Sequence, residues 1–229
     1  MHFMKHGLIA ILPLAAGAAI YGFAFGLLAA QVGFPWWGVG FMSAIVHAGS
    51  SQIVAVEQFA NSSAIIGAAL AGATLNLRYI GIVASLSEIL KELPLPLKIV
   101  AIHITGDENW ALTMAERARS PSIGAPFLMG SGLAMISVWT FSTIMGAVVG
   151  TILPDLEKFG LGFAFTAAFI AMGRSLWKGT PNLIPWLSAF TFTVIAVMFG
   201  LPQAYAIVIG ATVGLLFSCF IRVKQGRLP

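Results

Sequence analysis

The hydrophobic residues of this chain form long runs that no charged residue interrupts. Residues 6–56, 120–154 and 179–221 contain no Asp, Glu, Lys or Arg. A helix needs about 20 apolar residues to cross the ~30 Å hydrocarbon core of a bilayer, because each residue adds about 1.5 Å. Each run is therefore long enough for one or two crossings, and the pattern predicts an all-α integral membrane protein.

Turn-forming residues divide these runs into separate spans. Pro, in three cases together with Gly, occurs at "GFPWWG", "ELPLPLK", "LPDLEK", "KGTPN" and "GLP", which is typical of helix ends at a membrane surface. Between them we expect spans at about residues 8–33, 36–60, 63–90, 125–151, 158–177, 182–200 and 202–222. A single transmembrane domain then covers residues 1–229, with the polar motifs in residues 7–150 and the last spans in residues 158–222.

The segment of residues 99–116 leaves the number of spans open. It is apolar at its start and polar around Asp107, so it is an eighth crossing, a re-entrant piece or an interfacial helix. Basic residues gather on the cytoplasmic side of membrane proteins, and this rule slightly prefers seven spans to eight. Either number places the C-terminus in the cytoplasm. We therefore expect a polytopic bundle of seven or eight helices, with one or more of them discontinuous.

The composition supports a membrane protein without a catalytic domain. The chain is 59% hydrophobic and 9% charged, with a mean hydropathy of +0.94, whereas soluble proteins are about 25% charged. Its net charge of +4 comes from bases at segment ends, which membrane topology explains better than nucleic-acid binding. The sequence contains neither a phosphate-binding G-x-x-x-x-G-K-[ST] motif nor a metal-spaced Cys/His set. We expect no enzyme activity, no cofactor and no metal, so that a gradient or a partner drives any transport.

A polar cluster interrupts the apolar run of residues 41–60. It consists of His47, Gly49, Ser50, Ser51 and Gln52. Such a cluster favours a local helix break, and the backbone groups freed there must line a cavity rather than face lipid. Half-helix N-termini attract carboxylates and freed carbonyls attract cations, so a zwitterionic amino acid suits the site. We predict that residues 49–52 form this break; the alternative is an unbroken helix whose serines bond to i−4 carbonyls.

Ionisable residues at membrane depth are the other candidates for function. Arg78 lies well inside its expected span and cannot deprotonate in practice, so it needs a carboxylate, a set of carbonyls or the substrate. Asp107 and Glu108 are the nearest acidic cluster away from a span end, and adjacent helical residues point in different directions. We predict that one of them pairs with Arg78 in one transport state and exchanges with substrate or proton in another. The alternative is a wet interfacial helix whose acids complement its dipole. His47 is either a proton-linked residue or a satisfied core histidine.

Small residues predict close packing of the first span. Gly17, Gly22 and Gly26 permit another helix to approach closely. For Ser50 and Ser51, helix packing is the alternative to ligand contact, because small polar residues often join membrane helices.

Four motifs occur in an order that is typical of one family. They are "YGFAFGLLAAQVG" at residues 21–33, preceded by Pro13 and Gly17, then "SAIVHAGSSQ" at 43–52, "NLRY" at 76–79 and "GDENWAL" at 106–112. With them, residues 7–150 resemble the AzlC-type family, the large subunits of branched-chain amino acid permeases linked to azaleucine resistance. The rest of the chain resembles that family only as hydrophobic spans.

The resemblance implies a substrate, a partner and a set of site residues. It implies export of leucine, isoleucine and valine across the bacterial inner membrane, together with a small hydrophobic subunit of the AzlD type. The substrate-binding candidates are then Gly49, Ser50, Ser51, Gln52, Asn76 and Arg78, and the coupling or ion-pair candidates are His47, Asp107 and Glu108. His47 and Gly106 depart from the family pattern, which favours an apolar or aromatic residue and a polar residue at these positions.

Three other functions stay open from the sequence. A transporter of another small zwitterion fits the same residues. A channel needs a continuous polar path, whereas the polar residues cluster in the first half of the chain. A lipid-modifying enzyme needs a dense acidic and histidine cluster, and His103, Asp107 and Glu108 are its only basis.

Overall fold

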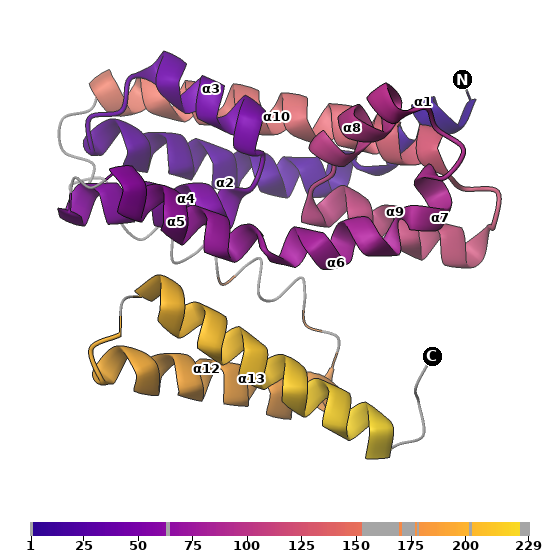
Figure 1. Ribbon diagram of the computed structural model, residues 1–229. Helices are drawn as coiled ribbons and strands as arrows, with labels where there is room; N and C mark the ends of the chain where they lie inside the picture. The colour runs from indigo at the N-terminus through magenta and orange to yellow at the C-terminus, as the bar shows by residue number, and fades with distance from the viewer. Residues whose placement is uncertain are drawn as a thin grey trace.

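The computed structural model describes residues 2–62, 65–152, 170, 177, 179–201 and 203–224. Every regular element within these residues is helical (Figure 1). The helices are α1 (His2–Ala10), α2 (Leu12–Gln31), α3 (Trp36–Val46), α4 (Gly49–Ser62), α5 (Ile65–Asn76), α6 (Arg78–Ser85), α7 (Ser87–Leu90), α8 (Leu95–His103), α9 (Asp107–Arg119), α10 (Ala125–Ile152), η2 (Thr180–Asn182), α12 (Leu183–Met198) and α13 (Gln203–Lys224). The predicted all-α class is confirmed for this part of the chain, while the span expected at residues 158–177 lies outside it except for residues 170 and 177.

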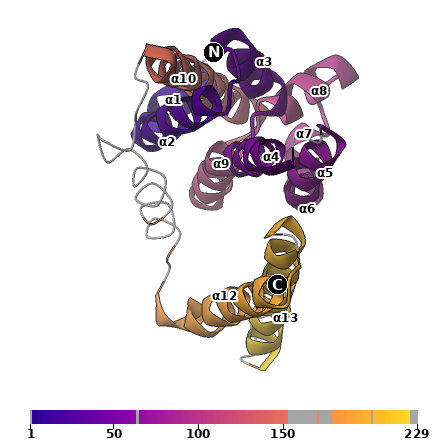
Figure 2. The same cartoon turned by 90° about the vertical axis from the view of Figure 1, so that its left-hand side faces the viewer.

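Helices α2 and α10 pack along each other through small residues (Figures 1 and 2). Among the described helices, these two are long and apolar enough to cross a membrane by length and composition. A side chain on Gly26 would meet the backbone of Thr143 and Ala147, and one on Gly22 would meet Trp139. Close approach at these two glycines is thus confirmed. Gly17, in contrast, faces open space.

The segment of residues 36–60 is a helical hairpin rather than one span. Helix α3 ends at Val46, the chain turns at His47 and Ala48, and α4 runs back toward the end of the bundle where α3 began (Figure 1). The prediction of a single crossing here was therefore wrong. An apolar run has a length but carries no information about whether the chain continues or reverses within it.

Contacts at both ends of this hairpin show the reversal. Near the turn, Gln52 Nε2 on α4 donates a hydrogen bond to Ser43 Oγ on α3 at 3.0 Å. At the open end, the rings of Phe34 and Phe59 lie edge to face with centroids 5.3 Å apart. The hairpin thus enters the bundle from one end and leaves it at the same end.

A second hairpin, α8 and α9, enters from the opposite end of the bundle (Figure 1). Its turn is Ile104–Gly106, and its arms share a hydrophobic cluster that includes Ala101 and Trp110. Of the three possibilities left open for residues 99–116, a single continuous crossing is excluded, and the hairpin has the shape of a re-entrant piece.

Helices α5, α6 and α7 pass beside both hairpins. Figure 1 shows α5 and α6 following one line, with a short interruption at Leu77. This segment corresponds to the span expected at residues 63–90.

One end of the bundle collects the basic residues of its connections. These are Lys5 in α1, Lys91 and Lys98 around the α7–α8 connection, and Arg117 and Arg119 at the end of α9. The same end holds the open end of the α8–α9 hairpin and the start of α10 (Figure 1).

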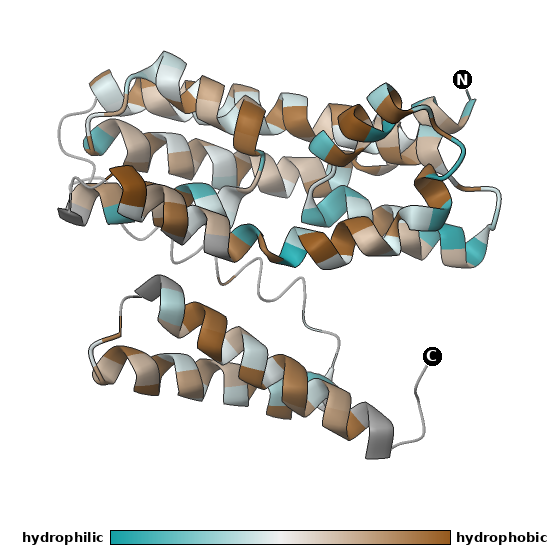
Figure 3. Cartoon of the chain, in the orientation of Figure 1, coloured by the Kyte–Doolittle hydropathy of each residue, from teal (hydrophilic) through white to brown (hydrophobic). Residues whose placement is uncertain are grey.

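Helices α12 and α13 form an antiparallel pair that contacts the rest through α13 and α5 (Figure 2). A side chain on Gly210 would meet Ala189 and Thr193, so small residues again allow close contact. Figure 3 shows hydrophobic residues, in brown, along the helices of both this pair and the bundle. Phe190, Met198 and Phe220 are among the exposed apolar residues. The total of seven or eight spans stays a prediction, as does a single domain over residues 1–229.

Candidate functional site

The turns of the two hairpins meet beside the interruption of the α5–α6 span. Each of these three points begins a helix: α4 at Gly49, α6 at Arg78 and α9 at Asp107. A helix N-terminus carries unsatisfied N–H groups and a positive partial charge. The N-terminal ends of α4, α6 and α9 therefore converge on one region inside a largely apolar bundle, together with the C-terminal ends of α3, α5 and α8.

The first turn has a strained backbone at His47. This residue adopts the left-handed conformation, with φ 43° and ψ 44°, and is the described non-glycine residue with positive φ. The left-handed conformation costs a non-glycine residue about 1–2 kcal/mol, and such strain is concentrated at functional sites. The break lies at His47–Ala48. The prediction that residues 49–52 form it was therefore wrong, because these residues are the first turn of α4. The alternative of an unbroken helix is excluded.

A buried hydrogen-bond network fixes the start of α4. Trp139 Nε1 on α10 donates to Gln52 Oε1 at 3.0 Å, and Gln52 Nε2 donates to Ser43 Oγ. Thr143 Oγ1 donates to the same Ser43 oxygen at 2.9 Å. All four side chains are buried. Because each buried polar group finds a partner, the network joins α3, α4 and α10 without a desolvation penalty.

A separate bond holds α4 against α5. Ser51 Oγ donates to Asn76 Oδ1 at 2.7 Å, close to where the backbone of Ser51 lies against Gly72. Ser51 and Asn76 therefore fix the position of α4 relative to the α5–α6 interruption.

The third helix start is built around Gly106. Its backbone N–H donates to Asn109 Oδ1 at 2.6 Å, so the Asn109 side chain caps the N-terminal end of α9. The Asn109 amide also donates to the carbonyl of Leu128 on α10 at 3.3 Å. This cap projects Asp107 and Glu108 from the turn toward the other two helix starts.

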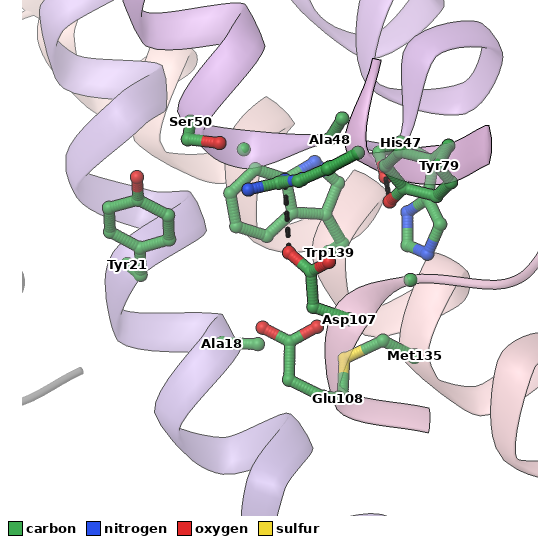
Figure 4. Close-up of a pocket in the computed structure, with 13 residues that line it drawn as sticks. Ala18, Tyr21, His47, Ala48, Ser50, Tyr79, Asp107, Glu108, Met135 and Trp139 are labelled. Atoms are coloured by element: carbon green, nitrogen blue, oxygen red, sulfur yellow. Dashed lines mark hydrogen bonds and ion pairs between the residues drawn. The ribbon is translucent and has the colours of Figure 1, made fainter. Parts of the chain in front are cut away.

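A cavity of about 70 Å³ lies between the three helix starts. Its lining comprises Ala18, Tyr21, His47, Ala48, Gly49, Ser50, Arg78, Tyr79, Gly106, Asp107, Glu108, Met135 and Trp139. In Figure 4, Tyr21 and Ser50 lie on one side, His47 and Tyr79 on the other, and Asp107 and Glu108 between them. The cavity thus has a charged part and an apolar wall of α2 and α10 side chains.

The ion pair between Arg78 and one acidic residue is present. Arg78 Nη2 lies 2.9 Å from Asp107 Oδ2, drawn as a dashed line in Figure 4. The two side chains are 39% and 45% exposed, so a solute can reach them. An accessible pair contributes only about 0–1 kcal/mol to stability. Arg78 can therefore exchange Asp107 for another carboxylate at low cost.

Two polar side chains of the cavity have no protein partner among the described residues. Both ring nitrogens of His47 and the hydroxyl of Ser50 are buried without a hydrogen bond. His47 is only 7% exposed. Buried polar groups normally have partners, so these exceptions need an explanation. A bound polar ligand would supply the missing hydrogen bonds.

The structure divides the residues predicted from the sequence into two groups. Those that line the cavity are His47, Gly49, Ser50, Arg78, Asp107 and Glu108. Ser51, Gln52 and Asn76 were predicted to bind substrate, but their side chains bond to the framework described above and do not line the cavity. A cluster of polar residues in sequence does not show which of its members faces inward and which holds the helices together.

Among the lining residues that were not predicted from the sequence, four have large side chains. Tyr21, Tyr79, Met135 and Trp139 are apolar or aromatic residues in apolar segments, where nothing local distinguishes a cavity wall from a packed core. Of these four residues, Tyr79 alone is adjacent in sequence to a predicted residue, Arg78. Its hydroxyl lies 3.5 Å from the carbonyl of His47, which places α6 beside the first turn.

Comparison with known proteins places this site within a family. Residues 13–153, more than half of the chain and all of the cavity lining, match the AzlC protein family. The chain belongs to the AzlC family. The expected resemblance over residues 7–150 is thereby confirmed.

Relatives of this AzlC-family chain are membrane proteins. It is 27% identical over 221 residues to the inner membrane protein YgaZ of Escherichia coli K12, covering 94% of this chain and 89% of YgaZ. It is 26% identical over 185 residues to an uncharacterized membrane protein of Helicobacter pylori 26695, 80% of each chain. An uncharacterized membrane protein of Archaeoglobus fulgidus is 29% identical over 179 residues, 76% of each chain. No solved structure gives a significant match. Family and relatives indicate a membrane protein with a transport-related role.

Proposed function

We propose that this protein is a secondary transporter that exports branched-chain amino acids, namely leucine, isoleucine or valine, across the bacterial inner membrane. The observation that carries the proposal is the cavity where two re-entrant hairpins meet, with an accessible Arg78–Asp107 pair at two helix starts. Discontinuous helices that meet inside the bilayer are the usual substrate sites of secondary transporters. The family resemblance supplies the substrate class and the direction.

The residues of the cavity fit the parts of such a substrate. Arg78 and the start of α4 offer donors to a carboxylate. Ala18, Met135 and Trp139 offer an apolar wall to an aliphatic side chain. The cavity volume of about 70 Å³ is small beside the ~300–1,000 Å³ of ordinary ligand pockets. Binding therefore requires the cavity to widen, and a movement of the α8–α9 turn away from α6 would open the Arg78–Asp107 pair at the same time.

The proposal includes an orientation in the membrane. Basic residues gather at the end of the bundle that holds Lys5, Lys91 and Arg117, and we assign that end to the cytoplasm. A cytoplasmic C-terminus remains part of the proposal. Reporter fusions after residue 93 and at the C-terminus test both assignments.

A small hydrophobic membrane subunit of the AzlD type is the proposed partner. Exposed apolar side chains on the helices fit contact with lipid as well as with a subunit. The proposed partner therefore rests on the family resemblance. Co-purification of a tagged chain with its partner, and transport with and without that partner, test it. Full transport by the chain alone would reject the requirement.

Counterflow of labelled leucine into proteoliposomes tests the transporter itself. Vesicles preloaded with unlabelled leucine should accumulate label transiently and saturably, with the chain alone or together with its partner. A carrier gives this overshoot because its site is exposed to one side at a time, whereas a channel does not. Label that only equilibrates would favour the channel, and no movement in either preparation would reject leucine as substrate.

A further inference from the structure

A gap between Glu108 and His47 lies directly beside Gly106. The point where a Cβ on Gly106 would stand is 3.4 Å from Glu108 Oε2 and 3.4 Å from His47 Nε2. The missing side chain of Gly106 therefore lets a ligand atom come into contact with the backbone here, with a carboxylate oxygen on one side and an imidazole nitrogen on the other. Gly106, Glu108 and His47 all line the cavity, so the space belongs to it; Figure 4 shows the side chains of Glu108 and His47.

The backbone does not require glycine at residue 106. Its φ of −107° and ψ of 179° are extended values that any residue adopts. Its N–H bond to Asn109 is also available to any residue except proline. What glycine changes at this position is therefore the space left by its missing side chain.

Both groups beside the gap keep hydrogen-bonding capacity for a ligand. The ring nitrogens of His47 have no hydrogen-bond partner, although the residue is 7% exposed. The carboxylate of Glu108 makes no ion pair among the described residues, because Arg78 is paired with Asp107. A carboxylate and a neutral imidazole both accept hydrogen bonds. The Glu108 carboxylate already takes a hydrogen bond from its own backbone, but it has lone pairs to spare, so the gap offers acceptors to a ligand.

We infer that the gap beside Gly106 is a subsite for a primary ammonium group, held between Glu108 and His47. The inference rests on the proposed function and gives the substrate one orientation. Its ammonium group donates to Glu108 Oε2 and His47 Nε2, and its carboxylate points to Arg78. Asp107 is then the internal group that occupies Arg78 when the substrate is absent.

An ammonium group fits these acceptors better than an alkali cation. Na⁺ is a hard cation that prefers oxygen ligands, and imidazole nitrogen suits transition metals instead. The N–H groups of an ammonium can bond both the carboxylate and the unprotonated ring nitrogen. Binding of an ammonium group and binding of Na⁺ can be tested separately.

Binding experiments on the purified protein test the subsite directly. Thermal unfolding is followed with leucine, with 3-methylbutylamine, which has only the ammonium, and with 4-methylpentanoate, which has only the carboxylate. Each ligand that binds the folded state raises the melting temperature with concentration. All three should stabilise the wild type, with leucine acting at the lowest concentration.

Two variants should remove the ammonium end alone. In Gly106→Ala the new Cβ fills the gap at ordinary contact distance, so the ligand-free protein should melt like the wild type. Glu108→Gln keeps the shape and removes the charge. Both should weaken 3-methylbutylamine and leucine about tenfold or more, as expected for a lost charged hydrogen bond, and leave 4-methylpentanoate unchanged. Gly81→Ala, which points into open space, and Glu88→Gln, which lies in an exposed pair with Lys91, are the matched controls.

The outcomes separate this inference from the proposed function. Unchanged amine and leucine affinity in both variants overturns the subsite, and so does a wild type that 3-methylbutylamine does not stabilise. Stabilisation by Na⁺ without amine that Gly106→Ala abolishes also overturns it, in favour of a metal-cation site. Amine binding that depends on Gly106 and Glu108, combined with no leucine counterflow, supports the subsite and rejects only the transport of leucine.

Discussion

Arg78 Nη2 lies 2.9 Å from Asp107 Oδ2, and the pair joins the first residue of α6 to the first residue of α9. Asp107 is favourably placed, because a negative charge at a helix N-terminus is stabilising by about 0.3–1 kcal/mol. Arg78 begins α6 but also directly follows the C-terminal end of α5, because Leu77 alone separates the two helices. The two helix ends have opposite partial charges, so Asp107 is the group that balances the charge of Arg78.

Replacing Arg78 should impair transport even when its charge is kept. Lysine is a point charge and cannot make the planar two-pronged contact of a guanidinium with a carboxylate. We expect both Arg78→Lys and Arg78→Gln to reduce leucine counterflow about tenfold or more, consistent with loss of a charged hydrogen bond. Arg119→Lys, in an exposed pair with Glu116, is the control. Near-normal counterflow by both Arg78 variants at equal membrane abundance would contradict this role.

Removing the carboxylate of Asp107 should separate binding from turnover. If Asp107 competes with substrate for Arg78, then Asp107→Asn frees the arginine and lowers the KM for leucine. The maximal rate should fall, because no protein carboxylate then takes the place of the substrate at Arg78, and substrate release slows. Initial rates over a range of leucine concentrations measure both quantities. Glu116→Gln should change neither, and an Asp107→Asn protein with unaltered KM and rate would count against the exchange.

Gln52 should act through the framework rather than through the substrate. Gln52→Met keeps the approximate shape but leaves Trp139 Nε1 without its buried partner, which costs about 1–3 kcal/mol. It also removes one of the two donors to Ser43 Oγ. The melting temperature should fall by several degrees. Gln31→Met, at the exposed end of α2, should leave it unchanged. Equal melting temperatures for Gln52→Met and wild type would show that the network does not stabilise the hairpin.

The sequence predicted the charged part of the site better than the path of the chain. The pairing of Arg78 with one acidic residue followed from the cost of an unpaired guanidinium in a membrane, which is independent of fold. The reversal at His47 did not follow, because the hydrophobic pattern of residues 36–60 is the same for a span and for a hairpin. The apolar wall at Trp139 also could not be found, since it depends on the distant contact with Gln52.

The last prediction compares two glycines of the same helix. A Cβ on Gly26 would meet the backbone of Thr143, Gly146 and Ala147 on α10, and backbone atoms cannot move aside as a flexible side chain can. Gly26→Ala should therefore force α2 and α10 apart and destabilise the protein by about 1–3 kcal/mol, the usual cost of overpacking.

Gly17→Ala is the matched control, because its new Cβ points into open space. It should be neutral or stabilise by up to about 1 kcal/mol, since alanine favours a helix over glycine. The melting temperatures of the two variants in one detergent should thus move in different directions, and equal shifts would refute close backbone contact at Gly26. Helices α2 and α10 also carry Tyr21 and Trp139 of the cavity wall, so Gly26→Ala should weaken leucine binding as well, whereas Gly17→Ala should leave it intact.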